Sequence, residues 1–330
     1  MSNTLCVDIG NYSVLTAVAG ASISRQRSLI YDATHNKECR DGVHPADSPL
    51  IEVGGKHYKI GVLAKNYPNF LSAVEAGKSN PDLILPILLA NTPDGFEGDI
   101  KFLVPVRDEL TEALIKTAVV KHHEYSITSE GRRTNCVCNF TNIDFVRETD
   151  SAAKFAYNSG VIAPDSVALV ADIGGGTVNA VICSYDNGIL HTTWRQSYDN
   201  SGGIALAQSI ANTDVVKSYG RAFDTAKIMD AITEGKAYIG KRTDLSFETV
   251  LDDCITQWFN GIVTRLMSAA DKYCDEVTQV VWCGGGAEIV RQRLLKKAHS
   301  GLNITIIDNP QYANINGLIA SVKPTLRVAA

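Results

Sequence analysis

Two stretches of the chain share one order of hydrophobic and polar positions. The first is "LCVDIGNYSVLTAVAG" at 5–20 and the second is "ALVADIGGGTVNAVICSY" at 168–185. Short apolar runs bounded by glycines are typical of buried strands, so each stretch predicts two strands joined by a turn. Because the copies lie half a chain apart, they predict two related domains of similar size. The aligned positions are Asp8 with Asp172, Gly10 with Gly174, Ser13 with Thr177 and Val14 with Val178.

Three further segments predict helices among these strands. Residues 146–160 predict a helix that ends at Gly160, and residues 278–301 predict a strand, three glycines and an amphipathic helix. Residues 309–321 predict a short helix with small residues at Ala313 and Gly317, which packing alone would explain. Strands that alternate with helices favour an α/β fold.

Composition and charge limit the class of protein. The chain has 330 residues, 45% of them hydrophobic and 20% charged, which is typical of a globular protein with a substantial core. A net charge of -5 argues against direct binding of nucleic acid. The eight cysteines form no CxxC pair, which favours free thiols in a reducing cytosol over zinc or disulfides. We see no apolar run of membrane-spanning length and no leader, and expect a cytoplasmic protein without a membrane partner.

The repeated turns can bind phosphate. A tight turn after a strand aims successive backbone N–H groups into one concavity, glycine allows close approach, and a Ser or Thr hydroxyl adds a donor. An acid at the end of the strand can hold the water shell of Mg²⁺. One such turn could equally be a plain hairpin with a polar tip, but two aligned copies favour a polyphosphate site.

Other candidates lie outside the repeat. Gly284, Gly285 and Gly286 join a strand to a helix, which is common in α/β proteins, but Gly285 and Gly286 would also let a ribose or base lie against the backbone. An acid in a first helical turn is usually a favourable dipole or capping residue. Glu148 precedes the second turn closely enough that we consider it a catalytic carboxylate, whereas we expect Asp150 to face solvent.

These motifs, in this order, resemble the actin, chaperone and sugar-kinase ATPase superfamily. The segments "RETDSAA", "YDNSGGIALAQSI", "CGGGAEIVRQRLLKKAH" and "NPQYANINGLI" are most similar to bacterial plasmid-segregation actins of the ParM type. The resemblance implies two actin-like (ribonuclease H-like) domains around a nucleotide-binding cleft. Domain I would comprise residues 1–147 with the C-terminal helix at about 308–330, and domain II residues 148–307. The resemblance to ParM-type actins is weakest at residues 35–80 and 217–249.

The resemblance also implies roles for individual residues, with ATP/ADP and Mg²⁺ as cofactors. Asp8 and Asp172 would hold the metal through water, and Glu148 and Asp172 would order the attacking water. Tyr12 departs from the small residues usual in the first turn, so its side chain either points outward or narrows the phosphate site. Lys227 and Lys236 are candidates to cover the base. The nucleotide-binding residues would be Asp8, Gly10, Asn11, Tyr12, Ser13, Gly174, Gly175, Gly176, Thr177, Gly284, Gly285, Gly286 and Glu288.

Superfamily membership leaves several functions open. We favour an ATPase, with GTP as an alternative nucleotide, that forms head-to-tail filaments and segregates DNA through an adaptor protein. A filament that controls cell shape and a sugar-kinase-like phosphotransferase are the alternatives, and a chaperone would need a further peptide-binding domain. The sequence leaves open the cargo, the number of strands in the filament and the identity of the adaptor.

Overall fold

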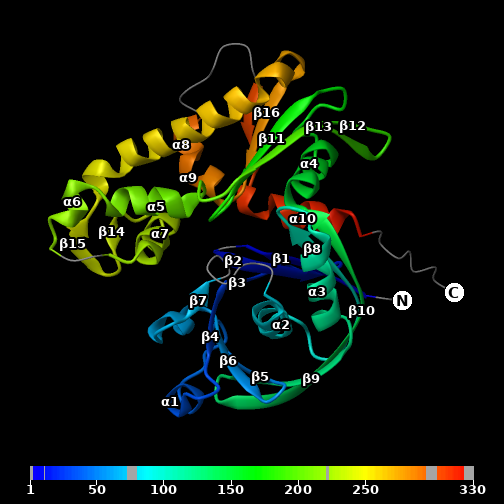
Figure 1. Cartoon of the computed structure of the whole chain (residues 1–330), viewed down its shortest axis with the longest axis vertical. Coiled ribbons are helices and arrows are strands. Elements are labelled where there is room, and N and C mark those ends of the chain that lie inside the picture. The colour runs from blue at the N-terminus through cyan, green and yellow to red at the C-terminus, as the bar shows by residue number, and fades with distance from the viewer. Residues whose placement is uncertain (1–2, 11, 73–79, 221–222, 295–302, 323–330) are drawn as a thin grey trace. The chain divides into compact units, whose positions relative to one another are not determined.

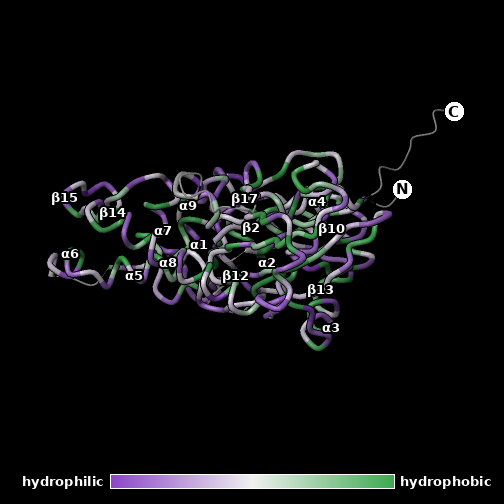
Figure 2. The backbone as a smooth tube through the Cα atoms, turned by 90° about the horizontal axis from the view of Figure 1, so that it is seen from above, coloured by the Kyte–Doolittle hydropathy of each residue, from purple (hydrophilic) through white to green (hydrophobic). Residues whose placement is uncertain are grey.

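The computed structural model describes residues 3–10, 12–72, 80–220, 223–294 and 303–322. The chain divides into two compact units (Figure 1). Unit 1 comprises Met1–Glu148 with Ile315–Ala330, and unit 2 comprises Thr149–Asn314. Hydrophobic and hydrophilic stretches alternate along the chain (Figure 2). Among the described residues, no helix is both long and apolar enough to cross a membrane.

Unit 1 is built on a mixed ten-stranded sheet in the order β3-β2-β1-β8-β10-β9-β5-β6-β4-β7. β1 and β8 are parallel, as are β8 and β10, and the other pairs are antiparallel. The strands are β1 (Asn3–Ile9), β2 (Ser13–Val18), β3 (Ser24–Arg27), β4 (Leu29–Asp32), β5 (Leu50–Val53), β6 (Lys56–Ile60), β7 (Leu71–Ser72), β8 (Phe96–Val104), β9 (His122–Ser129) and β10 (Arg132–Arg147).

The helices of unit 1 pack on this sheet. The sheet curves around α2 (Figure 1), and the helix buries Ile84, Ile87 and Leu88 against strand residues such as Ile9 and Val14. This packing fixes β1 and β2, which carry the first predicted turn. The helical segments are α1 (Lys37–Arg40), η1 (Val62–Asn66), α2 (Pro81–Ala90), α3 (Glu109–Val119) and the part of α10 (Ala313–Ala320) that belongs to unit 1.

Unit 2 is built on a five-stranded sheet in the order β13-β12-β11-β16-β17, with a separate hairpin. β11, β16 and β17 are parallel, and β12 and β13 form an antiparallel edge. The strands are β11 (Ala168–Ile173), β12 (Val178–Asp186), β13 (Ile189–Tyr198), β14 (Tyr238–Ile239), β15 (Arg242–Ser246), β16 (Gln279–Cys283) and β17 (Asn303–Ile306). The helical segments are α4 (Glu148–Asn158), α5 (Gly203–Ala211), α6 (Asp214–Lys217), α7 (Thr225–Thr233), α8 (Glu248–Ala270), η2 (Asp271–Glu276), α9 (Gly285–Leu294) and η3 (Pro310–Tyr312).

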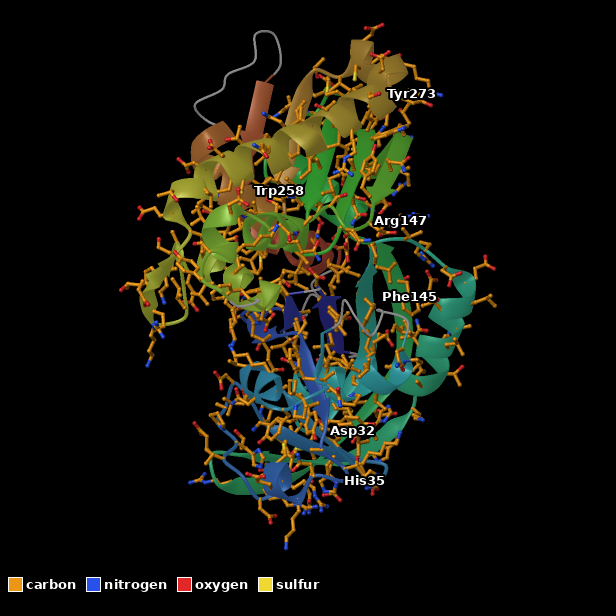
Figure 3. The ribbon with its side chains drawn as sticks, turned by 60° about the vertical axis from the view of Figure 1, so that its left-hand side comes forward. Asp32, His35, Phe145, Arg147, Trp258 and Tyr273 are labelled. Carbon is orange, nitrogen blue, oxygen red and sulfur yellow. The ribbon has the colours of Figure 1, made fainter. Side chains whose placement is uncertain are left out.

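Strand β11 is buried on both faces, as its apolar run predicts. Val170 packs with α4 on one face, whereas Leu169 and Ile173 pack with α8 and α9 on the other. Alternate side chains of a strand point to opposite faces, so Asp172 lies on the face of Val170 and α4. Helix α8 also braces the loop before α5, since Trp258 (labelled in Figure 3) donates from Nε1 to Ser201 O at 2.9 Å.

The predicted local elements are confirmed. The segment 146–160 contains α4, the segment 278–301 contains β16 and α9, and the segment 309–321 contains η3 and α10. All eight cysteines are free, and seven of them are buried.

Candidate functional site

The two predicted turns close with the same geometry. In unit 1, Gly10 N donates to Ser13 O at 3.0 Å, directly beyond the last strand pair, Ile9 with Val14. In unit 2, Gly174 N donates to Thr177 O at 2.9 Å, beyond the pair Ile173 with Val178. The repeat read from the sequence is therefore a repeat of backbone structure. Asn11 lies outside the described residues.

The second turn is supported by the start of α5. The carbonyls of Gly174 and Gly175 accept from the N–H groups of Gly203 and Ile204, at 3.0 and 2.8 Å. The carbonyl of Gly176 accepts from Ser201 N at 3.1 Å and from Gly202 N at 3.2 Å. In a trans peptide the N–H of the next residue points away from each carbonyl. The N–H groups of Gly175, Gly176 and Thr177 therefore point away from α5, which is the arrangement that binds a phosphate group.

Gly202 makes this close approach possible. A Cβ at this position would lie 2.4 Å from Gly174 O and 2.6 Å from Gly175 O. No side chain fits that space, which explains the first glycine of the segment "YDNSGGIALAQSI". Sequence reasoning did not single out Gly202 because its neighbours in space lie in a different segment.

The first turn is supported by one serine. Ser28 Oγ donates to Gly10 O at 2.5 Å, and Ser28 N donates to Tyr12 O at 3.2 Å. The N–H of Ser13 points away from the Tyr12 carbonyl for the same geometric reason as in the second turn. Tyr12 stacks against the guanidinium of Arg27, whose Cζ lies 3.5 Å from the ring centroid. Neither Ser28 nor Arg27 was singled out from the sequence.

The predicted acids Asp8 and Asp172 occupy equivalent, buried positions. Asp8 is paired with Leu15 in the strand register and Asp172 with Asn179, two residues before the turn glycine in each unit. Their exposed fractions are 8% and 3%. Burial raises the pKa of the Cys6 thiol, two residues before Asp8 on the same strand, to about 11, although Lys101 lowers it. A nearby cation favours the charged form of a buried carboxylate.

Asp172 is held by residues from two other segments. Asn314 Nδ2 donates to Asp172 Oδ2 at 2.7 Å, and Ser151 Oγ donates to Asn314 O at 2.8 Å. A Cβ on Gly284 would lie 2.1 Å from Asp172 Oδ1, and Gly284 has a φ of +84°. Asn314 lies within a segment that the sequence singled out, but its role was missed because its partner is 142 residues away.

The three glycines after β16 have different surroundings. Gly284 is required by its backbone conformation and by Asp172, whereas a Cβ on Gly286 would lie 2.3 Å from Ile173 Cγ2. Gly285 begins α9, and a Cβ there would meet nothing within 4 Å. Only Gly285 of the three has open space beside it. It is therefore the glycine whose backbone a ribose could approach most closely.

The remaining predicted residues lie at helix starts. Glu148 is the first residue of α4 and is 5% exposed. Asp150, expected to face solvent, instead pairs with Arg195 at 3.0 Å and is 24% exposed, so that expectation was wrong. Glu288 lies in the first turn of α9 and pairs with Arg291 at 3.1 Å.

The two lysines considered for the base lie around α7. Lys227 is in its first turn, and Lys236 lies just beyond its end, where it pairs with Glu234 at 2.6 Å.

The residues around Asp172 fit a Mg²⁺ ion held through water. Asn314 Oδ1 is buried and has no hydrogen-bond partner among the described residues. This amide oxygen and the Asp172 carboxylate are hard oxygen donors, and Mg²⁺ usually keeps several waters and takes only one or two carboxylates. In the described part of the chain, no cluster of three or more His, Cys, Asp or Glu forms a metal site. Direct coordination by several side chains is therefore not the mode that these residues favour.

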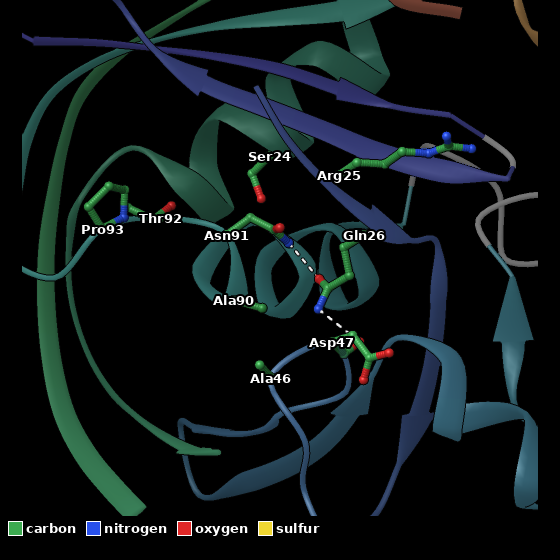
Figure 4. A pocket seen from close by; sticks show the side chains of 9 residues that line it. All are labelled: Ser24, Arg25, Gln26, Ala46, Asp47, Ala90, Asn91, Thr92 and Pro93. Carbon is green, nitrogen blue, oxygen red and sulfur yellow. Dashed lines mark hydrogen bonds between the residues drawn. The ribbon is translucent and has the colours of Figure 1, made fainter. Parts of the chain in front are cut away.

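A polar pocket of about 310 Å³ lies elsewhere in unit 1, between β3, the end of α2 and the loop before β5 (Figure 4). Asn91 Nδ2 donates to Gln26 Oε1 at 2.8 Å and to Ile87 O at 2.8 Å. None of the predicted site residues lines this pocket. The bond between Asn91 and Gln26 ties β3 to the end of α2.

Comparisons with known proteins show which fold the chain has. Residues 170–296 match the family model of the C-terminal domain of archaeal MreB-like actin homologues. The structure is similar to an archaeal actin homologue, Ta0583, with a TM-score of 0.76 at 15% identity over 96% of this chain and 98% of that one. It is also similar to the ADP complex of Ta0583, with a TM-score of 0.74 at 17% identity over 96% and 97%.

A third similar structure is a 15-stranded ParM filament from Clostridium botulinum, with a TM-score of 0.75 at 15% identity over 97% and 98% of the two chains. A search of curated proteins gave no match. The predicted resemblance to actin homologues of the ParM type is confirmed at the level of the fold. The protein has the two-domain α/β fold of the actin homologues.

Proposed function

We propose that this protein binds ATP with Mg²⁺ through both turns, hydrolyses it and assembles into filaments. The observation that supports this most is the repeated geometry: each unit places a buried aspartate two residues before a turn closed by the same hydrogen bond. Two related structures point the same way, since one is an ADP complex and another is a filament. GTP remains the alternative nucleotide.

Each group of site residues would have its own role in binding or hydrolysing the nucleotide. The N–H groups of Gly175, Gly176 and Thr177 would bind phosphate oxygens in unit 2, and those of the first turn would do so in unit 1. Asp8 and Asp172 would hold the waters of Mg²⁺, and Asn314 would keep the Asp172 carboxylate in position. The metal would supply charge neutralisation for the phosphoryl group. Glu148 would orient the attacking water and accept its proton.

A sugar-kinase-like activity is less well supported. It needs a base aimed at a hydroxyl group of an acceptor, and Asp150 was the additional acid considered for this role. Asp150 is instead committed to an ion pair with Arg195 inside unit 2. We therefore propose that water is the acceptor and that turnover needs no second substrate.

Filament assembly would use the nucleotide as a switch. A subunit whose end surfaces bind one another better in one nucleotide state assembles in that state, by differential affinity. Head-to-tail contacts that do not close into a ring produce a filament. DNA segregation through an adaptor protein is the use that we propose for it, and the acidic net charge of -5 supports an adaptor over direct binding of DNA.

The test combines light scattering and phosphate release on the full chain. We expect scattering to rise above a critical protein concentration with Mg-ATP, and to fall as phosphate is released. Asp172→Ala should lower turnover by about 10³-fold, because it removes several kcal/mol of metal-dependent stabilisation. Asp186→Ala, an acid at the far end of β12, is the matched control. Wild-type turnover by Asp172→Ala, or turnover only after a hydroxylated compound is added, would contradict the proposal.

A further inference from the structure

Asn179 is a buried amide beside the second turn. Its exposed fraction is 4%, and in the strand register it pairs with Asp172 of β11 on one side and with Ser197 of β13 on the other. These three strands are neighbours in the unit 2 sheet (Figure 1). Paired residues share a face of the sheet, and so do residues two apart along a strand, which places Thr177 on the same face. A row of polar side chains therefore crosses the sheet next to the turn.

Two hydrogen bonds connect the edge strand β13 to the turn. Ser197 Oγ donates to Asn179 Oδ1 at 2.7 Å, and Asn179 Nδ2 donates to Thr177 Oγ1 at 3.5 Å. A side-chain amide accepts through its oxygen and donates through its nitrogen. Because the serine hydroxyl occupies the oxygen, the NH2 group of Asn179 is the end that faces Thr177.

The Thr177 hydroxyl thereby receives a direction. A hydroxyl group has one proton and two lone pairs, and this one already accepts from Asn179. Its own proton must then go to a different acceptor, and the described part of the chain offers none to it. A Cβ on Gly174 would lie 3.7 Å from Thr177 Oγ1, so the hydroxyl lies close to the backbone of the turn. The proton is left for a ligand at the turn.

The first turn shows that this polar row is not needed to build the turn. The residue of unit 1 that corresponds to Asn179 is Leu15, which pairs with Asp8 and with Arg25. The turn there closes with the same backbone hydrogen bond, from Gly10 N to Ser13 O. An apolar residue at this position is therefore compatible with the fold of the turn. The amide in unit 2 calls for another explanation, and its contact with the hydroxyl supplies one.

We propose that Asn179 and Ser197 are positioning residues for the Thr177 hydroxyl, which they hold with its proton directed to a phosphate oxygen. Ser197 sets the orientation of the amide, Asn179 occupies a lone pair of the hydroxyl, and Thr177 donates to the ligand. The inference rests on the proposed nucleotide function and adds two residues to the phosphate-binding part of that site. The ligand group is the polyphosphate of a nucleotide.

The test is a double-mutant cycle on the full chain, with affinities for Mg-ATP and for adenosine measured by competition with a fluorescent ATP analogue. Thr177→Val should weaken ATP by about 10–100-fold, the effect of losing a hydrogen bond to a charged group. Asn179→Leu, which copies unit 1, should weaken ATP by about 5-fold because the hydroxyl can turn away. In the Thr177→Val background the same change should have an effect of less than about 2-fold, because coupled residues are not additive. Adenosine affinity should stay unchanged throughout.

Ser197 gives a second readout at a residue farther from the turn. Ser197→Ala should weaken ATP by about 3-fold, because the amide loses the hydrogen bond that orients it, and Ser197→Thr should restore the affinity because it keeps the hydroxyl. Thr193→Ala removes an exposed hydroxyl from the same strand and is the matched control. Thermal unfolding of each variant checks that the fold is retained.

The outcomes separate this inference from the proposed function. Wild-type protein that binds no nucleotide overturns both. Wild-type protein that binds Mg-ATP, with Asn179→Leu at the same affinity, overturns this inference alone. An equal loss from Asn179→Leu with and without the Thr177 hydroxyl also overturns it, since Asn179 would then act independently of Thr177. Equal losses for adenosine and ATP would make Asn179 structural and overturn it as well.

Discussion

The turns of the two units close with the same hydrogen bond but are supported by different groups. The unit 2 turn rests on the first N–H groups of α5, and Gly202 lets the two backbones touch. The unit 1 turn rests on Ser28 and carries a tyrosine stacked on Arg27. The position of unit 2 that corresponds to Arg27 holds the acid Asp199. Gln26, the residue before Arg27, pairs with Val14, and Tyr198, the residue before Asp199, pairs with Val178. The same backbone turn is therefore held by two different sets of contacts.

We infer that each unit supplies one buried acid for the water shell of Mg²⁺, Asp8 in unit 1 and Asp172 in unit 2, and that unit 2 also holds its acid in position through a second residue. Asp172 is held by Asn314, whose other amide atom is a buried acceptor. Such hydrogen-bonding partners orient the groups around a metal and are needed for tight binding.

The largest effect is expected at Glu148, the buried acid that begins α4. Glu148→Gln should keep ATP binding and lower turnover by about 10²–10⁴-fold, because it removes the proposed general base and keeps the shape of the side chain. Filaments should then persist for longer after assembly. Phosphate release and light scattering measure both effects, with the exposed Glu97→Gln as the control. Loss of binding together with turnover would make Glu148 a structural residue.

A smaller effect is expected at Asn314. Asn314→Ala should raise the Mg²⁺ concentration needed for half-maximal turnover by about 10–100-fold, as for other residues that orient metal ligands. Asn316→Ala, on the same helix, is the control. Turnover that depends on Mg²⁺ as in the wild type would remove Asn314 from the metal site.

The smallest effects are expected at the glycines after β16, and they differ in kind. Gly284→Ala should destabilise the fold by about 1–3 kcal/mol, because it strains a positive-φ position beside Asp172. Gly285→Ala should leave the melting temperature nearly unchanged, since a Cβ there meets nothing. If a ribose lies against Gly285, the same variant should lose ATP affinity. Thermal unfolding and nucleotide binding measured together show whether Gly285 is a ligand contact or an inert position.

The sequence predicted the local elements and the alignment of the two turns, since both depend on residues close together in the chain. It could not predict the groups that support the turns. Ser28 lies 18 residues from Gly10, and Asn314 lies 142 residues from Asp172. Their roles depend on which segments the fold brings together. The expectation that Asp150 faces solvent was wrong for the same reason, because its ion-pair partner Arg195 is on the edge strand β13.

We propose that the two turns, one from each unit, bind the same nucleotide. Isothermal titration of the full chain with Mg-ATP tests it most directly, together with the single variants Asp8→Ala and Asp172→Ala. We predict one nucleotide per wild-type chain, and loss of that one site in each variant. Two nucleotides per wild-type chain, with one retained in each variant, would mean that the turns act separately and would contradict the account.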